Sequence, residues 1–291
     1  YKGAPVPGSA RVVFAVAATT KTTLADPGTG TPLYEHKAVF RDLKSATTYR
    51  YRITDGANGV GKTGVMTTPV SKAGETFQFG FLTDPQAVDA AGYIPFRGAL
   101  RRLLGQAPDM SFLILGGDIV DNGAKTSQWW GFYETAASWL DSLPWLAVPG
   151  NHEYKEDAAL AGYKAFVGMP ATGPSGMGER SYTVQNGDAR FYMLDTQDDL
   201  DAQLAWLRAE RNASDAVWHI VVMHRGIYGG FYDESGYRAK AAPVFDELGI
   251  DLVLSGHDHT WQRTTMKDGQ QVKPGEGTTY ITGGSAGAKF Y

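Results

Sequence analysis

Short apolar runs alternate with amphipathic segments after residue 76, and this alternation is the strongest constraint on how the chain can fold. The apolar runs have the length of buried strands, and the segments between several of them have the period of helices. The expected strands are residues 77–83, 111–115, 145–148, 190–194, 218–223, 251–254 and 279–282. The expected helices are residues 94–104, 127–140, 158–166, 200–208 and 238–248. This order of strands and helices predicts a layered α/β domain.

The first 70 residues have a sequence pattern typical of an all-β fold instead. Runs rich in Val, Thr, Tyr and Phe at residues 11–18, 33–40, 47–54 and 61–68 are separated by Gly, Asp, Asn and Pro. The segment around Tyr49 resembles the strand that carries the tyrosine corner of fibronectin type III and related sandwiches. Such a sandwich has roughly 100 residues. We therefore expect an incomplete β-sandwich over residues 1–70, an α/β domain over residues 76–291, and further strands beyond the last residue.

Composition excludes several classes of protein. The chain has no cysteine, so it forms no disulfides, zinc–thiolate sites or cysteine nucleophiles. The net charge is -4 and no basic run exceeds a pair, so nothing favours a nucleic-acid partner. The apolar runs are too short to span a bilayer, and we expect no membrane segment.

Polar side chains follow five of the expected strands, at the point where each strand ends. The segments are Asp84-Pro85-Gln86, Gly117-Asp118, Gly150-Asn151-His152-Glu153, His224-Arg225 and Gly256-His257-Asp258-His259. Open α/β sheets gather their sites at the carboxyl ends of strands. Carboxylates, amide oxygens and imidazoles suit hard or borderline divalent and trivalent ions. The segments therefore predict a site for two ions about 3.5 to 4 Å apart.

In this order the segments resemble the calcineurin-like metallophosphoesterases, and with a preceding β-sandwich the chain resembles the purple acid phosphatases. The resemblance implies two packed β-sheets flanked by helices, preceded by a small all-β sandwich. It implies a dinuclear phosphatase that hydrolyses small phosphate monoesters with a metal-activated hydroxide, using Fe, Zn or Mn. It also implies an extracellular or cell-surface location. The implied ligands are Asp84, Asp118 and His259 for the first ion and Asn151, His224 and His257 for the second, with Asp118 bridging.

Two positions depart from the family. Most metallophosphoesterases have a metal-binding His at the position of Gln86, and purple acid phosphatases have a Tyr at the position of Asp121. We interpret Gln86 as a weak or water-mediated ligand of the first ion. We interpret Asp121 as the partner of His152, as in the phosphoprotein phosphatases, and expect His152 to protonate the leaving oxygen. Arg225 is either a phosphate-binding group or a salt-bridged surface residue, and we expect Glu153 to support a ligand or the backbone.

Two other functions stay open at this point. One is a phosphodiesterase or nucleotidase that uses the same site. The other is a non-catalytic binding or adhesion module with a degenerate metal site, which only the replacement of the usual His by Gln86 favours. The segment at residues 283–287 matches the nucleophile elbow of α/β-hydrolases, but no His follows His259, so we interpret that match as accidental.

Overall fold

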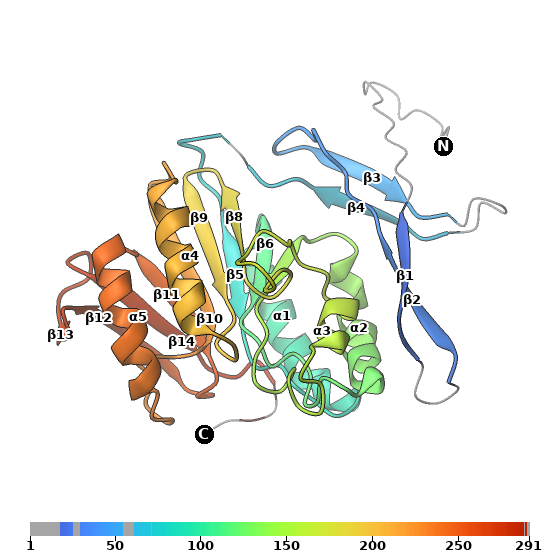
Figure 1. The fold of residues 1–291 in the computed structure, drawn as a ribbon. Coiled ribbons are helices and arrows are strands. Elements are labelled where there is room, and N and C mark those ends of the chain that lie inside the picture. The colour runs from blue at the N-terminus through green and yellow to red at the C-terminus, as the bar shows by residue number, and fades with distance from the viewer. Residues whose placement is uncertain (1–17, 26–29, 55–60, 71, 288, 290–291) are drawn as a thin grey trace.

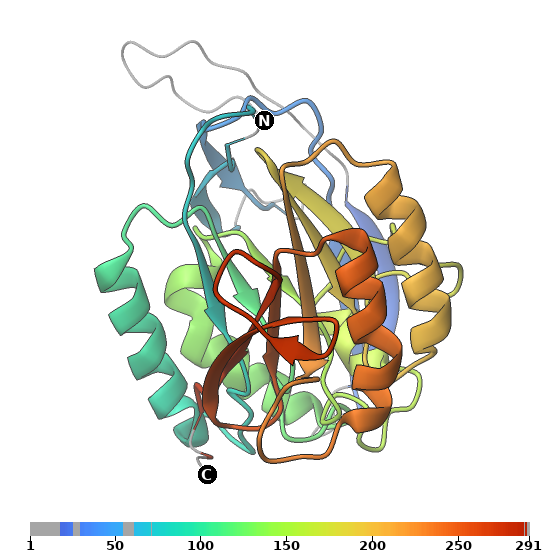
Figure 2. The same cartoon turned by 90° about the vertical axis from the view of Figure 1, so that its left-hand side faces the viewer.

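The computed structural model describes residues 18–25, 30–54, 61–70, 72–287 and 289. Its main body consists of two β-sheets that pack face to face between two layers of helices (Figure 1). Figure 2 looks along these layers, with α1 in teal on one side and α4 and α5 in orange on the other. The α/β fold with sheets flanked by helices agrees with the sequence-based prediction.

The smaller sheet has three parallel strands in the order β5-β6-β7. These strands are Phe79–Leu82 (β5), Phe112–Leu115 (β6) and Trp145–Ala147 (β7). On its outer face lie the helices Ile94–Gln106 (α1), Thr126–Leu140 (α2) and Ala161–Phe166 (α3), and the short 3-10 helix Ala91–Tyr93 (η1) precedes α1. All three predicted helices of this half are present.

The larger sheet has seven strands in the order β13-β12-β14-β11-β10-β9-β8. They are Tyr182–Asn186 (β8), Ala189–Leu194 (β9), Trp218–Arg225 (β10), Leu252–Gly256 (β11), Trp261–Lys267 (β12), Gln270–Gln271 (β13) and Thr278–Gly283 (β14). The four central strands run parallel, and β8, β12 and β13 are antiparallel to their neighbours. The outer face is covered by Leu200–Asn212 (α4) and Ser235–Leu248 (α5).

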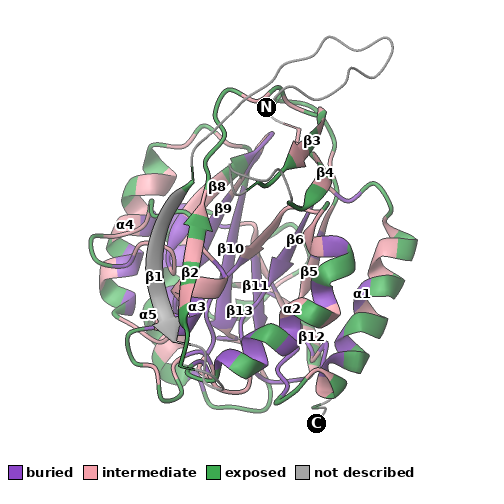
Figure 3. Ribbon diagram, turned by 90° about the vertical axis from the view of Figure 1, so that its right-hand side faces the viewer, coloured by how far each residue is buried: buried purple, intermediate pink, exposed green. Residues whose placement is uncertain are grey.

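Aromatic packing joins the two sheets. The rings of Phe79 and Phe112 stack at 5.7 Å, and Phe191 from the larger sheet meets both edge-on at 5.2 and 5.4 Å. A second core lies between the larger sheet and its helices, where Leu207 and Phe245 are fully buried. The strands β6, β9, β10 and β11 are covered on both faces, as Figure 3 shows in purple, which explains why their sequences are nearly continuous apolar runs.

The described strands before residue 70 form two separate pairs. Thr19–Ala25 (β1) pairs with Pro32–Lys37 (β2), and Thr48–Arg52 (β3) pairs with Thr63–Thr67 (β4). The hydroxyl of Tyr49 accepts a hydrogen bond from the backbone N–H of Lys44 at 2.8 Å, a contact typical of a tyrosine corner. A fibronectin-type sandwich is nevertheless not confirmed in the described residues. The strand expected at residues 11–18 lies outside them except for Ala18.

The helices in the described part of the chain are all too short or too polar to cross a lipid bilayer.

Candidate metal centre

The predicted ligand segments meet where the two sheets bring their strand ends together. Four of the residues there have left-handed backbones, namely Asp84 (φ 55°), Asp118 (φ 51°), His257 (φ 73°) and His259 (φ 55°). This region is uncommon for residues other than glycine, and such strain concentrates at functional sites. Each of the four residues lies within three positions of the end of β5, β6 or β11, and their side chains come close together.

Hydrogen bonds fix the carboxylate of Asp84 inside this cluster. Thr83 Oγ1 donates to Asp84 Oδ2 at 2.6 Å, and the backbone N–H of His257 lies 3.1 and 3.0 Å from the two carboxylate oxygens. The loop after β5 and the loop after β11, which belong to different sheets, are thereby held against each other.

The buried carboxylates and imidazoles form two overlapping groups that could each hold a metal ion. One consists of Asp118, His224 and His257, and the other of Asp84, Asp118 and His259. Within each group the possible ligand atoms all lie within 4.8 Å of one another. Asn151 Oδ1 lies 3.1 Å from His224 Nε2, next to the first of these groups. The structure therefore brings together the six residues implied as ligands, and Asp118 belongs to both groups.

Gln86 lies beside the group that contains Asp84. Its Nε2 atom is 3.4 Å from Asp118 Oδ2 and 3.4 Å from His259 Nε2. The side chain is buried, and its Oε1 atom has no hydrogen-bond partner among the described residues. A 180° flip of the side-chain amide exchanges the positions of Oε1 and Nε2. The oxygen would then point toward Asp118 and His259.

The ionisation of the site is set by contacts between Asp118 and the neighbouring imidazoles. Burial opposes ionisation of Asp118, but the adjacent His224 imidazolium holds the pKa of that carboxyl well below its usual range. Burial likewise opposes the charge on His224, but Asp118, whose Oδ2 lies 3.3 Å from its Nε2, raises the pKa of His224 to about 10. Burial and the neighbouring positive charges of His224 and Arg225 lower the pKa of His257 to about 3, so its ring is neutral and able to bind a metal.

A buried carboxylate supports the backbone of Asp118. Glu153 Oε2 accepts hydrogen bonds from the N–H groups of Asp118 and Gly150, and Oε1 accepts from Ile119 and Val120. The burial of Glu153 and the charge of Asp118 raise the pKa of Glu153 to about 7. Sequence reasoning expected a supporting role here, and the side chain indeed contacts backbone donors from two loops.

His152 faces the candidate ligands with one nitrogen and the surface with the other. Nδ1 lies 2.7 Å from the backbone oxygen of Asp121, 3.3 Å from its Oδ1 and 2.7 Å from Lys155 Nζ. In one tautomer Nδ1 donates to Asp121, and in the other it accepts from Lys155. Nε2 lies 3.8 Å from Asp118 Oδ2. The nearest oxygen of Asp121 is thus its carbonyl, while its carboxylate pairs with Lys289 at 2.8 Å.

Arg225 is held beside His257 by a buried acid. Its Nη1 atom lies 2.6 Å from Glu234 Oε1 and 3.3 Å from His257 Nε2, and Nη2 lies 3.4 Å from Gln197 Oε1. Glu234 is only 6% exposed, and the same Oε1 lies 3.5 Å from His257 Nε2. Arg225 is therefore ion-paired, but at the edge of the candidate site. Phosphate binding by this residue stays a prediction.

Sequence reasoning assigned no role to Glu234 or Asp258. Asp258 is fully buried, and its Oδ2 accepts hydrogen bonds from the N–H groups of Gly230 and Phe231, at 2.7 and 3.1 Å. In the sequence, the position of Asp258 between His257 and His259 could have indicated a role in the site. Glu234 offered none, because it lies 9 residues from Arg225 in a loop and its burial depends on how that loop packs.

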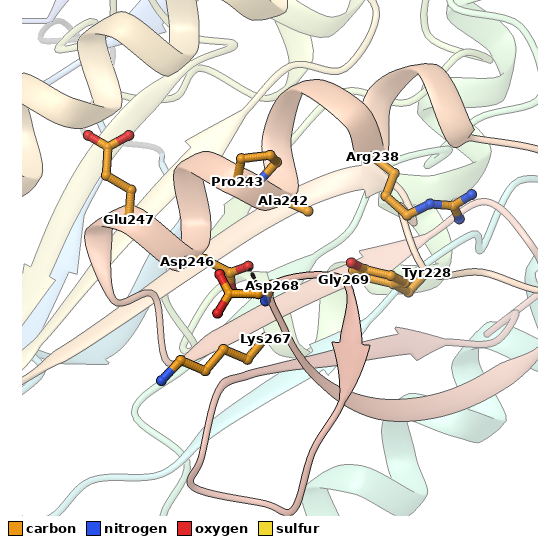
Figure 4. A pocket seen from close by; sticks show the side chains of 9 residues that line it. All are labelled: Tyr228, Arg238, Ala242, Pro243, Asp246, Glu247, Lys267, Asp268 and Gly269. Atoms are coloured by element: carbon orange, nitrogen blue, oxygen red, sulfur yellow. Dashed lines mark hydrogen bonds between the residues drawn. The ribbon is translucent and has the colours of Figure 1, made fainter.

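A groove of about 650 Å³ lies elsewhere, between α5 and the β12–β13 turn (Figure 4). It is lined by Tyr228, Arg238, Ala242, Pro243, Asp246, Glu247, Lys267, Asp268 and Gly269. None of the predicted site residues is among them, and charges of both signs line it. The groove is therefore separate from the candidate metal centre.

Residues 77–261 match the family model of the calcineurin-like phosphoesterases. The matched segment contains all five strand-end segments, the whole smaller sheet and strands β8 to β11 of the larger one. The chain belongs to this family of phosphoesterases.

Within the family, the chain is similar to plant purple acid phosphatases. It is 24% identical over 258 residues to purple acid phosphatase 1 of Ipomoea batatas, covering 80% of this chain and 52% of that protein. It is also 24% identical over 289 residues to a phosphoenolpyruvate phosphatase of Allium cepa, covering 89% of this chain and 58% of that protein. The chain thus spans little more than half the length of these relatives.

A solved structure shares the fold. Purple acid phosphatase PPD1 from yellow lupin (Lupinus luteus) seeds superimposes with a TM-score of 0.76 at 16% identity, covering 94% of this chain and 57% of that chain.

Proposed function

We propose that this chain is a dinuclear metal-dependent phosphatase that hydrolyses phosphate monoesters. The observation that carries the proposal is the position of Asp118, which belongs to both buried groups of potential ligands. A shared carboxylate between two such groups is the arrangement of a two-metal site.

The residues present fit two ions of iron, zinc or manganese. Asp84, Asp118, His259 and the oxygen of Gln86 would hold the first, and Asp118, Asn151, His224 and His257 the second. The buried Gln86 Oε1, which has no hydrogen-bond partner in the described part of the chain, supports this assignment. When bound, the two ions would acidify water to give a nucleophile near neutral pH and neutralise the negative charge of the phosphate.

The need for metals follows from the size of the barrier. Enzymes accelerate phosphate monoester hydrolysis by up to about 10²¹-fold, whereas general acid–base catalysis supplies only about 10² to 10⁴-fold. His152 alone therefore does not account for such a reaction. Its part in the proposal is to donate a proton from Nε2 to the leaving oxygen, while Asp121 or Lys155 fixes Nδ1 on the other side of the ring.

Arg225 is proposed to bind the phosphate with those guanidinium N–H groups that Glu234 does not occupy. The side chain is 24% exposed and its Nη1 lies 3.3 Å from His257 Nε2, so the guanidinium lies beside a candidate ligand with part of its surface accessible. Loss of Arg225 should therefore raise KM more than it lowers kcat. We also propose an extracellular or cell-surface location, which rests on the resemblance to purple acid phosphatases and is tested by fractionating the source cells.

The test combines metal analysis of the purified protein with kinetics on an aryl phosphate monoester and the matching diester. We expect about two metal ions per chain, turnover of the monoester, and loss of turnover on chelation that returns when metal is added. Faster turnover of the diester would replace the proposal with a phosphodiesterase. Bound metal without turnover of either ester would support a binding module.

A further inference from the structure

The parallel strand β9 is followed by a polar segment, Asp195-Thr196-Gln197, that lies beside the candidate site. Leu194, the last residue of β9, pairs with Met223 of β10, so the chain leaves β9 next to the point where β10 reaches His224. The side chain of Asp195 is fully buried. A buried carboxyl group requires hydrogen-bond partners, and those of Asp195 lead to two parts of the site.

One oxygen of Asp195 is tied to the loop that carries Asn151 and His152. Asp195 Oδ2 accepts a hydrogen bond from the hydroxyl of Tyr154, which follows His152 in the same loop. Arg180 Nη1 donates to this hydroxyl at 3.0 Å and lies 3.7 Å from Asp195 Oδ2. The hydroxyl is held from two sides, and this restricts movement of the loop on which His152 lies.

The other oxygen of Asp195 fixes the segment that contacts Arg225. Asp195 Oδ1 accepts a hydrogen bond from the backbone N–H of Gln197 at 2.9 Å. Gln197 Oε1 lies 3.4 Å from Arg225 Nη2, and the Arg225 backbone N–H donates to Thr196 Oγ1 at 3.3 Å. Glu234 contacts the other terminal nitrogen, Nη1, at 2.6 Å. Because each terminal nitrogen has an acceptor, the plane of the guanidinium group is defined.

We propose that Asp195 is a positioning residue that holds the proton donor His152 and the phosphate-binding Arg225 at a fixed spacing. It acts through Tyr154 on His152 and through Gln197 on Arg225. This inference rests on the proposed phosphatase function and assigns positioning residues to the same site. A misplacement of about 1 Å can lower a reaction rate about 100-fold, so hydrogen bonds that fix such groups affect activity without contacting the substrate.

The contact through Tyr154 predicts an effect on kcat that depends on the leaving group. Ethoxide requires a proton to leave, whereas 4-nitrophenolate leaves readily without one. Tyr154→Phe removes only the hydroxyl and should lower kcat about tenfold for ethyl phosphate but less than about twofold for 4-nitrophenyl phosphate. In a His152→Ala background the same change should cost nothing further.

The contact through Gln197 predicts an effect on KM instead. Gln197→Leu should raise KM about fivefold for both esters with little change in kcat, because it loosens the group that binds the phosphate. In an Arg225→Ala background it should have no further effect. Urea unfolding midpoints show whether each variant is folded.

Two matched controls remove the same chemical groups elsewhere. Tyr192→Phe deletes a buried hydroxyl on β9 itself, where Tyr192 contacts His219 Nδ1 at 3.0 Å. Gln185→Leu deletes an amide whose Oε1 accepts a hydrogen bond from Arg190 at 3.3 Å. Both controls should keep wild-type kcat and KM for the two esters.

Unchanged constants in Tyr154→Phe and Gln197→Leu would overturn the positioning role and leave the phosphatase intact. The role would equally fail if the Tyr154→Phe loss were the same for both esters, or persisted in full without His152. No hydrolysis of either ester by the wild type would reject the phosphatase proposal and the positioning role with it.

Discussion

Glu153 Oε2 accepts a hydrogen bond from the backbone N–H of Asp118 at 2.9 Å, so the buried side chain of one acidic residue fixes the backbone of another. The same side chain also binds the N–H groups of Ile119, Val120 and Gly150. The loops after β6 and β7 are therefore tied together at one point. Because Asp118 has a left-handed backbone, this support maintains a conformation that the residue would rarely adopt alone.

Glu153→Gln should destabilise the fold substantially. An amide has one acceptor oxygen, so two of the four backbone donors would face an NH₂ group in a buried site. Unsatisfied buried donors cost about 1–3 kcal/mol each, and we expect a loss of about 2–4 kcal/mol in the free energy of unfolding. Urea unfolding measures this loss. The control is Glu247→Gln, a surface acid paired with Arg208, which should barely move the unfolding midpoint.

Asp118→Asn should abolish phosphatase activity and lower the metal content of the purified protein. The variant removes the carboxylate that belongs to both candidate groups, and an amide binds cations more weakly. Metal analysis and kinetics check both effects. Asp109→Asn, in an exposed turn, is the matched control and should behave as wild type. Near-normal turnover of the Asp118 variant would refute the two-metal assignment.

His152→Ala should lower kcat by about 10² to 10⁴-fold while the metal content stays near wild type. Asp121→Ala should have a smaller effect, because the Asp121 carbonyl next to His152 Nδ1 remains in place. If Asp121 acts through His152, the double variant should be no worse than His152→Ala. Losses that add independently would mean that Asp121 has a separate task.

Gln86→Leu should weaken binding of one metal ion about tenfold, and Gln86→Glu should strengthen it, because the isosteric carboxylate is a better ligand. Competition with a chromophoric chelator measures both affinities. Gln106→Leu, on the exposed end of α1, is the control. Wild-type affinities in the Leu variant would show that Gln86 does not reach a metal.

Asp195 should make the stability depend on pH. Burial raises the pKa of Asp195 from 3.8 to about 6, so the folded chain holds this proton more tightly than the unfolded chain. The stabilisation of the fold by this proton is complete below pH 4 and is lost as the pH rises through 6. The free energy of unfolding falls by about 3 kcal/mol over this range. Asp195→Asn cannot ionise. The stability of wild type relative to this variant should therefore fall between pH 4 and 7, and a constant difference would contradict the prediction.

Much of the α/β domain was predictable because its central strands are covered on both faces. The run before Gly116 is buried at every position, and an unbroken apolar run of that length is a strong signal. The segments that form β8 and β12 were not predicted. β12 has an exposed or half-buried side chain at every position except Thr265, so its sequence is polar and resembles a loop.

The candidate site was predictable where its residues directly follow strands. Position along the chain was enough to select Asp118 and His257, because each follows the carboxyl end of a parallel strand, where α/β sheets gather their sites. It was not enough for Glu234, whose contact with Arg225 depends on the path of an irregular loop.

The arrangement of the first strands also depends on non-local pairing. The tyrosine-corner contact of Tyr49 is local and present, whereas a sandwich requires partners far along the chain.

The left-handed backbones at the candidate ligands have a consequence for anyone who wishes to re-engineer this centre for another ion. Asp84, Asp118, His257 and His259 occupy conformations that Asp, Asn and His tolerate better than most residues, and that β-branched side chains resist. Replacing any of these four residues with another type would strain the backbone as well as change the ligand chemistry. Gln86, Asn151 and His224 have no left-handed backbone, so these are the candidate ligand positions at which metal preference can be changed by side-chain chemistry alone.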